Sequence, residues 1–319
     1  MNNNSMGGHA LKTITTVRKN KVEYLEIKST IADVLSKNNI IFDFIPELDD
    51  KKSFGDLDIL WNQKTNPTIV MRDTIEQLFS PCEVVTNGDV ISFDYNDFQI
   101  DFIKCQSIDF AKCYFSYGDF GQLLGVVINK YDLTFGHNGF FCHINQTSLL
   151  LTQDVNQFFD FININFDQWK NIRTQYDLFE LIKTCKFYDP DLFIQSNHKH
   201  RLLLKNRPLY SEFLKYINLD TKTESISISS EDKEMVFNQA IVVFNKIDDI
   251  IKIQELDKKK EIIHSKFNGN MLKDMGYDGK QIGTIINKFK SLYDNFDEWI
   301  YQTKSEDIMA VLKVILLEI

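Results

Sequence analysis

Hydrophobic and polar residues alternate in a short segment of the first third of the chain. Leu57, Ile59 and Trp61 take every second position, and Asp56 and Asp58 come directly before Leu57 and Ile59. A β-strand sends residues i and i+2 to the same face. We therefore predict a strand whose apolar side chains point into a core, while the two carboxylates stand side by side on the opposite face.

A second alternating pattern predicts a β-hairpin. Val90–Tyr95 and Phe98–Cys105 are apolar segments joined by Asn96-Asp97, a two-residue sequence typical of a tight turn. In the second strand Asp101 faces away from the phenylalanines, within an otherwise apolar run. A lone buried acid would be costly without a partner or a metal. We expect this strand to lie beside the first one.

Other segments complete a head of mixed structure. Helical spacing of apolar residues predicts a helix over 22–37, and apolar runs predict strands near 40–45 and 68–71. Asp73 with Glu76 three positions later resembles a capping box that opens a short helix. These elements indicate a mixed sheet with flanking helices.

The rest of the chain changes from strands to helices. A helix over 119–130 precedes a hairpin over 133–144, in which an Asn-Gly pair signals the turn. From Asp154 onward helical periodicity dominates, and the polar stretch 220–232 is typical of a linker. The predicted fold class is α+β, with an N-terminal mixed-sheet head followed by an all-helical C-terminal body. The domains that we predict are 1–150, 151–222 and 231–319.

Composition narrows the functional classes. Lys and Arg number 36 and Asp and Glu 45, so the 319-residue chain has a formal net charge of −9. This charge argues against a protein that coats nucleic acid, but it permits an enzyme with a local basic groove. Five cysteines without C-x-x-C spacing predict neither a zinc ribbon nor a disulfide framework. No signal peptide or membrane span is recognisable, so we expect a cytoplasmic protein with no membrane partner.

The three acids form a candidate metal site. Carboxylates this close repel one another unless a cation lies between them, and Mg²⁺ prefers oxygen ligands. Asp56, Asp58 and Asp101 are therefore predicted as catalytic metal ligands that hold two Mg²⁺ ions roughly 3.5–4 Å apart, with Mn²⁺ as the alternative metal. Taken alone, an Asp-x-Asp pair is also explained by a solvated strand edge. The second apolar strand with its own acid favours the metal site.

These motifs resemble a known family. Ser53-x-Gly55-Asp56-h-Asp58, followed by h-Asp101-h-h (h, hydrophobic), resembles the nucleotidyltransferases of the DNA polymerase β superfamily. That family transfers a nucleoside monophosphate from a triphosphate to an acceptor. The resemblance implies a polymerase-β-like head in which Asp56 and Asp58 bind both metals, while Asp101 binds the catalytic metal and helps to deprotonate the acceptor.

The resemblance covers mainly residues 23–105. Three other stretches are similar to a phage, viral and fungal branch of the superfamily. They are Gly7–Ala10, Ser116–Asp119 and Lys205–Tyr210.

The chain departs from the family pattern in one respect. Typical members carry Gly-Ser or Gly-Gly at the end of the strand before the acids, where the backbone cradles the triphosphate, and this chain has no such pair there. Gly7 and Gly8 could fold back to do that work, with Arg18 contacting phosphate. Alternatively, they are the flexible end of an Asn-rich leader. Other predicted nucleotide contacts are Lys52, Ser53 and Gly55.

Two features of the helical body are candidates for binding the acceptor. The first is a basic cluster, for which a solvated helix face is the more frequent explanation; its predicted contacts are Arg201, Lys205 and Arg207. The second is a helix–glycine loop–helix around Gly276 and Gly279, similar to the C-terminal segment of tRNA nucleotidyltransferases. Its helix start could hold an acceptor phosphate. A simple helical hairpin with glycine caps is the slightly more frequent explanation of such a segment.

The sequence thus predicts an enzyme that uses a nucleoside triphosphate (NTP). We expect a metal-dependent nucleotidyltransferase that acts on the end of a nucleic acid, RNA rather than DNA, with a tRNA-like acceptor. Two alternatives stay open. The acceptor could be a protein or a small molecule, which the acidic balance favours, or the chain could be an inactive interaction module of the same fold.

Overall fold

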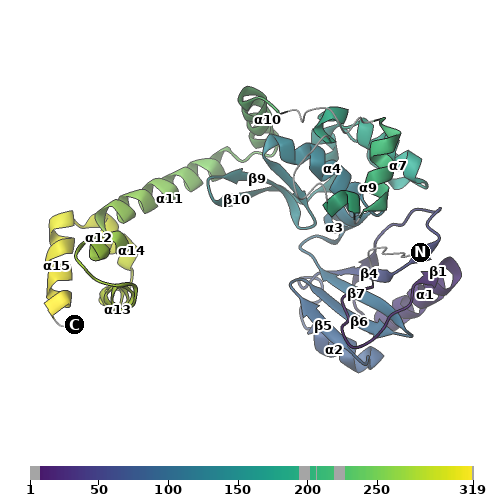
Figure 1. Ribbon diagram of the computed structural model, residues 1–319, viewed down its shortest axis with the longest axis horizontal. Coiled ribbons are helices and arrows are strands. Elements are labelled where there is room, and N and C mark those ends of the chain that lie inside the picture. Colours follow the sequence, from purple (N-terminus) through teal and green to yellow (C-terminus); the bar gives the residue numbers. More distant parts are fainter. Residues whose placement is uncertain (1–7, 194–201, 206, 219–226, 318–319) are drawn as a thin grey trace. The chain divides into compact units, whose positions relative to one another are not determined.

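The computed structural model describes residues 8–193, 202–205, 207–218 and 227–317 (Figure 1). The chain divides into two compact units, Met1–Asn245 and Lys246–Ile319, and each is described by itself. The α+β prediction is confirmed, with a mixed sheet in the N-terminal region and helices in the C-terminal region. The finer division into three domains stays a prediction.

A five-stranded sheet with the order β2-β4-β7-β6-β5 organises the N-terminal region. β4 and β7 are parallel, whereas the other neighbours are antiparallel. The strands are β2 (Phe42–Phe44), β4 (Asp56–Trp61), β5 (Val84–Asn87), β6 (Val90–Tyr95) and β7 (Phe98–Lys104). A two-stranded sheet of β1 (Lys19–Asn20) and β3 (Ser53–Phe54) precedes β4. The predicted hairpin is confirmed, because Asn96 and Asp97 join β6 to β7 with positive φ angles of 50° and 56°.

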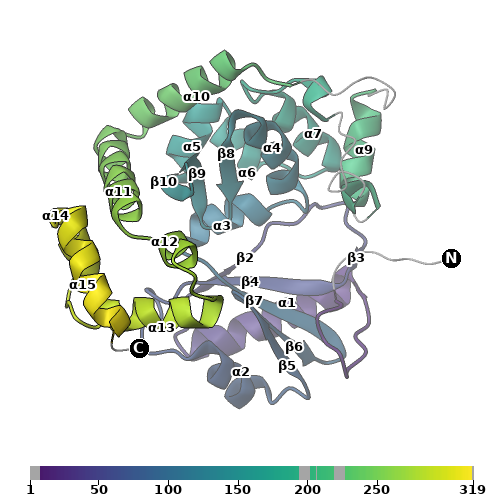
Figure 2. The ribbon, with the colours of Figure 1, turned by 60° about the vertical axis from the view of Figure 1, so that its left-hand side comes forward.

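Two helices cover one face of the five-stranded sheet (Figure 2). They are α1 (Lys21–Lys37) and α2 (Met71–Phe79). α1 begins with a capping box between Asn20 and Glu23, and its apolar residues pack on the sheet at helical spacing, which confirms the predicted helix. Ile59 and Phe102 are fully buried in this core.

The opposite face of the same sheet has two parts. Toward the carboxyl ends of β4 and β7, Leu60 and Ile103 pack against Ala111 of α3 (Ile108–Phe115). Toward their amino ends the same face carries the acids of β4 and β7, as the alternation predicted. Apolar packing therefore anchors one end of this face, and the other end is left for polar chemistry.

Two local predictions are wrong. No strand forms over 68–71; the backbone turns there, with the Ile69 N–H bonded to the Asn66 carbonyl. The capping box at Asp73 is absent as well, because α2 begins two residues earlier, at Met71, without a side-chain cap. A short apolar run such as this one suits a strand or a buried helix start equally well, so periodicity could not decide.

The remainder of the first unit surrounds an aromatic core that includes Phe110, Phe135 and Phe158. The hairpin over 133–144 is confirmed, and a third strand joins it in the order β10-β9-β8. The elements are α4 (Phe120–Ile128), β8 (Leu133–Gly136), β9 (Gly139–Ile144), β10 (Thr147–Thr152), α5 (Val155–Ile162), α6 (Phe166–Lys170), α7 (Gln175–Lys183), α9 (Pro208–Tyr216) and α10 (Ser230–Val243).

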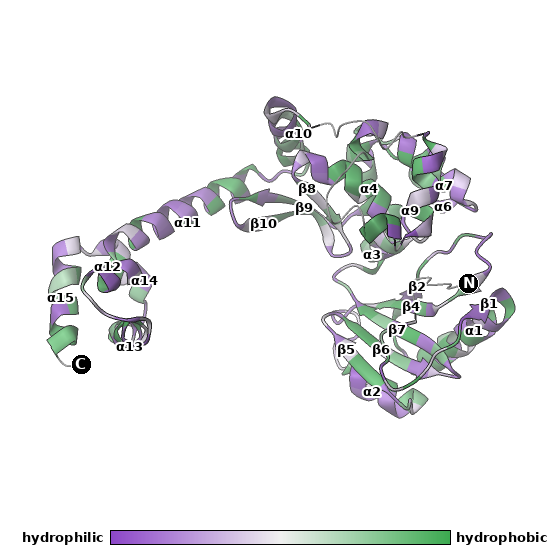
Figure 3. Cartoon of the chain, viewed as in Figure 1, coloured by the Kyte–Doolittle hydropathy of each residue, from purple (hydrophilic) through white to green (hydrophobic). Residues whose placement is uncertain are grey.

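The second unit is helical, with a core around Leu272, Ile285 and Phe289. Its helices are α11 (Ile247–Lys266), α12 (Gly269–Asp274), α13 (Gly279–Lys290), α14 (Phe296–Gln302) and α15 (Ser305–Leu317). Figure 3 shows hydrophobic residues along the strands of the five-stranded sheet, whereas much of α11 is hydrophilic, and α11 has no buried residue.

Among the described residues, no helix combines the length and apolar character needed to cross a membrane.

Candidate metal centre

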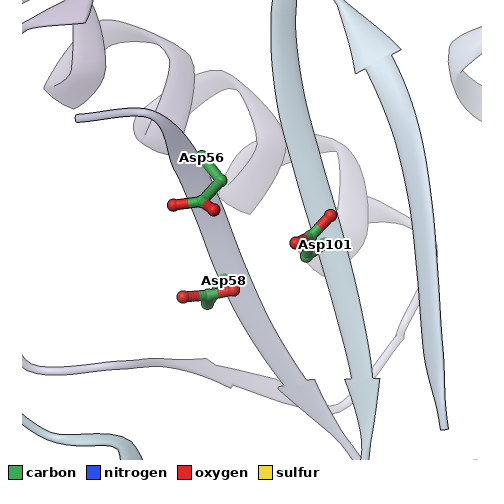
Figure 4. Close-up of side chains that lie close together, drawn as sticks. All are labelled: Asp56, Asp58 and Asp101. Atoms are coloured by element: carbon green, nitrogen blue, oxygen red, sulfur yellow. The ribbon is translucent and has the colours of Figure 1, made fainter. Parts of the chain in front are cut away.

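Three half-buried carboxylates lie close together on the face of β4 and β7, at the end that α3 does not cover (Figure 4). The parallel pairing of β4 and β7 makes Asp58 the direct partner of Asp101, and Asp56 lies two residues earlier on the same face as Asp58. Each side chain offers an oxygen, and these oxygens all lie within 4.8 Å of one another. Within the described part of the chain, this is the one group of three His, Cys, Asp or Glu side chains that could hold a metal ion.

The electrostatics of the three acids favour a bound cation. Burial raises the pKa of Asp58 well above its usual value, and the charges of Asp56 and Asp101 raise it further. Burial also raises the pKa of Asp56, and it raises the pKa of Asp101 to about 6. Like charges held together out of water resist ionisation. A divalent cation between them would remove that cost, so the donor set and its environment fit a metal.

Asp101 is oriented by its neighbours. The Gln99 amide donates to both of its oxygens, at 2.9 and 3.0 Å, and Ser92 of β6 also donates to it. These hydrogen bonds favour the charged form and limit the rise of the Asp101 pKa. Gln99 was not predicted as a site residue. Its position two residues before Asp101, on the same strand face, is the signal that could have identified it.

The N-terminal segment reaches the acids. The Gly8 N–H donates to Asp56 Oδ2 at 3.2 Å. Gly8 has a φ of +79°, and a Cβ there would lie 2.5 Å from the Gly55 carbonyl oxygen, so a larger residue would clash. The structure thus brings Gly8 and Gly55 to the metal centre. Their role in phosphate binding stays a prediction, and Gly7 lies outside the described residues.

Arg18 lies beside the same site. Its Nη2 donates to the Ser53 carbonyl oxygen at 2.8 Å, and its Nε donates to Ser53 Oγ at 3.2 Å. The positive charge of Arg18 lowers the pKa of Asp56. Arg18 Nη1 is buried and has no hydrogen-bond partner among the described residues. An unpaired donor at this position suits an oxygen-rich ligand. Lys52, also predicted to contact the nucleotide, is exposed.

A second group of charges, which the sequence did not single out, extends from the acids. Lys51 pairs with Glu47 at 2.7 Å, and its charge lowers the pKa of Asp56. Tyr24 stacks on Phe54, with ring centroids 3.9 Å apart. Burial raises the pKa of Tyr24, and the charges of Glu47, Asp58 and Asp56 raise it further.

Glu47 also lines a cavity of about 800 Å³. Other lining residues are Lys112, Tyr117, Phe166, Trp169 and Arg173. The charge of Glu47 also raises the pKa of Asp58, so this one lining residue acts on both the cavity and the metal centre. Its volume and its mixture of aromatic, acidic and basic side chains suit a small organic ligand.

The predicted acceptor residues are spread over the molecule. Arg207 forms an ion pair with the buried Asp119, at 3.1 Å. This ion pair joins two of the three stretches noted above for their similarity to the phage, viral and fungal branch. Lys51 lowers the pKa of both Asp119 and Asp56. Lys205 is exposed. Arg201 lies outside the described residues.

The glycine loop of the second unit is a capped helical turn. Gly276 has a φ of +94° and ends α12, where the Tyr277 N–H bonds back to the Leu272 carbonyl. Asp278 caps α13 next to Gly279 and accepts hydrogen bonds from two backbone N–H groups, at 2.9 and 3.0 Å. Donors at this helix start therefore already have a carboxylate partner. Acceptor binding by Gly276 and Gly279 stays a prediction.

No model of a known protein family matches the chain, and no curated protein matches it either. The nucleotidyltransferase resemblance therefore depends on the residues described above.

Proposed function

We propose that the protein is a metal-dependent nucleotidyltransferase that transfers a nucleoside monophosphate from an NTP to the end of a nucleic acid, RNA rather than DNA. The observation that carries this proposal is the pairing of Asp58 with Asp101 beside Asp56, because it gathers three acids that could hold a metal ion. Three carboxylates on adjacent strands are a donor set for Mg²⁺ or Mn²⁺, the metals that serve phosphoryl transfer.

Each acid has a role in the proposed reaction. Asp56 and Asp58 would hold both metal ions, and Asp101 would hold the ion on the acceptor side and accept the proton of the acceptor hydroxyl. Bound metal ions supply the charge that stabilises the attacking and leaving oxygens. The acceptor oxygen forms a bond to the α-phosphorus, the bond from that phosphorus to the bridging oxygen breaks, and pyrophosphate leaves with the electron pair.

Residues around the acids would position the triphosphate. Arg18 has an unpaired buried donor, Ser53 offers a hydroxyl, and the Gly8 N–H lies at the acids. Gly8 and Gly55 leave room for the backbone to approach phosphate closely. The cavity lined by Glu47 has space for the nucleoside, since ligand pockets of roughly 300–1,000 Å³ are typical.

A labelling assay tests this function. The full chain is incubated with mixed RNA, Mg²⁺ or Mn²⁺ and each NTP in turn, radiolabelled on the α-phosphate that is transferred. The same assay is run on Asp56→Asn and Asp101→Asn. Both substitutions should reduce label transfer by about 10²-fold or more, because each removes a charged metal ligand. The matched control is Asp97→Asn in the exposed turn of the same hairpin, where asparagine suits the positive φ. Transfer that survives both site substitutions would contradict the proposal.

The net charge of −9 favours a second candidate, in which the acceptor is a protein or a small molecule. Binding of labelled RNA at increasing salt separates the two, because phosphate contacts weaken steeply with salt. Label that appears on protein, together with no RNA binding at low salt, would favour the second candidate.

A further inference from the structure

A segment of half-buried and exposed residues, 8–18, lies against the sheet next to the metal centre; we call it the N-terminal strap. None of its residues is buried. Beyond the Gly8 contact, the Ala10 N–H donates to Gln99 Oε1 at 2.9 Å, and the Val17 N–H donates to the Asp97 carbonyl at 2.7 Å. Hydrogen bonds rather than apolar packing therefore hold the strap.

Residues 8–16 of the strap form a closed loop. Thr16 Oγ1 donates to the Gly8 carbonyl at 2.8 Å, which joins the two ends of the loop beside Asp56. Arg18, two residues after Thr16, contacts Ser53. The middle of the loop, residues 12–14, lies at Glu83, just before β5 at the other edge of the sheet.

Glu83 binds this middle part through several hydrogen bonds. Its carboxylate accepts from the backbone N–H groups of Lys12, Thr13 and Ile14, at 2.9, 2.8 and 3.0 Å, and from Thr13 Oγ1 at 2.7 Å. Asp94 fixes Glu83 in turn, by accepting from its N–H at 2.7 Å. The bonds to the strap lower the pKa of Glu83 to about 2, so the carboxylate is charged at neutral pH. Charged acceptors make the stronger hydrogen bonds.

We propose that Glu83 is a positioning residue for the triphosphate: by holding the middle of the N-terminal strap, it fixes Gly8 at the metal centre. The proposal rests on the proposed function. The Glu83 carboxylate accepts hydrogen bonds from three successive backbone N–H groups, and no side chain of residues 12–14 is buried. Removal of this carboxylate therefore releases the strap between Ala10 and Ile14. Arg18 keeps its own contacts with Ser53 and its place before β1, so the Gly8 side of the site loses most order.

The expected kinetic effect is selective. Glu83 lies outside the reacting groups, so Glu83→Ala should raise the KM for the NTP about tenfold and change kcat less than threefold. Such a split indicates lost binding of the triphosphate rather than lost chemistry. Gly8→Ala should reproduce the KM effect from the other end of the strap, because a Cβ clashes with Gly55.

Two measurements test the proposal without turnover. Hydrogen exchange of the full chain reads the amides of residues 10–14, and calorimetry with Mg²⁺ reads binding of a nucleoside triphosphate that carries a non-hydrolysable α,β-methylene bridge. Glu83→Ala should accelerate the exchange at least tenfold and weaken triphosphate binding about tenfold, with Glu83→Gln intermediate because one acceptor oxygen is kept. Glu76→Ala, an exposed glutamate on α2, is the matched control and should change neither.

Each outcome decides the question. Unchanged exchange in Glu83→Ala, or faster exchange with unchanged triphosphate binding, overturns the positioning role and leaves the proposed function intact. Triphosphate binding by the wild type without label transfer to any acceptor contradicts the proposed function, while the exchange and calorimetry still decide the role of Glu83. Absence of triphosphate binding in the wild type overturns both.

Discussion

The metal centre of the first unit and the glycine loop of the second unit differ in how their polar groups are satisfied. At the metal centre, burial raises the pKa of Asp56, Asp58 and Asp101, and repulsion from neighbouring acids raises the pKa of Asp58 and Asp101 further. In the glycine loop, Asp278 accepts two backbone hydrogen bonds and completes a capping box. The second arrangement stabilises its own helix, whereas the first is unfavourable until something else binds. This difference separates a candidate site from a structural motif.

The largest predicted effect concerns the metal centre, where the acids are close together and partly buried. Asp58→Asn should abolish label transfer, by about 10³-fold or more, and should also raise the melting temperature of the protein in chelator. The side chain loses a charge that burial and two neighbouring acids oppose, while its shape is kept. Thermal unfolding in EDTA, run beside the transfer assay, checks both expectations. Lower stability of the variant in EDTA would show that the acids are not under repulsion.

Metal addition should offset the same repulsion. At about 100 times the dissociation constant, a ligand that binds only the folded state adds about 2.7 kcal/mol to the free energy of unfolding. Mg²⁺ or Mn²⁺ should therefore stabilise the wild type by this order and leave Asp58→Asn nearly unchanged. Thermal unfolding at increasing metal concentration measures this stabilisation. An equal rise of the melting temperature in both proteins would show that the metal binds at a site other than the three acids.

The pH dependence of stability sharpens the comparison further. The folded pKa of Asp101 is raised from 3.8 to about 6, so the folded state binds this proton more tightly than the unfolded state. Relative to Asp101→Asn, the wild type in EDTA should lose stability as the pH rises from about 4 to about 6, and the difference should then level off. Allowing for solvent screening, we expect the free energy of unfolding of the wild type to fall by about 2 kcal/mol relative to the variant over this range. Urea unfolding of both proteins at several pH values measures it.

The smallest predicted effect concerns the glycine loop, where the polar groups already have hydrogen-bond partners. Asp278→Ala should cost about 1 kcal/mol of stability, because the start of α13 loses its cap, whereas Asp278→Asn should cost almost nothing. Neither substitution should alter label transfer, if the loop is purely structural. A change in the KM for RNA without a change in the KM for the NTP would instead support the predicted acceptor role of this loop.

The sequence predicted the acids well because strand alternation has a fixed period. It placed Asp56 and Asp58 on one face and Asp101 on the polar face of a second strand, and the structure confirms both. Periodicity also assigned α1 and the β6–β7 hairpin. It failed over 68–71, where a short apolar run is compatible with more than one element.

Other features could not be predicted because they depend on contacts between distant segments. The bonds from Glu83 to residues 12–14 join positions that share no local pattern. The same holds for the ion pair of Arg207 with Asp119. Gly8 was recognised as a candidate from the sequence. Only the three-dimensional structure shows that a Cβ at this position would clash with the Gly55 carbonyl oxygen.

The alternation along β7 also protects the protein against misfolding. If β7 paired with β4 one position out of register, Asp101 would turn into the core beneath α1 and α2, and phenylalanines would face the solvent. Burying an unpaired carboxylate there would cost several kcal/mol, so such a misaligned state is strongly disfavoured. The same acids that are candidates for chemistry thus act as a check on correct assembly. A molecule that has paired these two strands correctly has, by that step alone, brought its three carboxylates together.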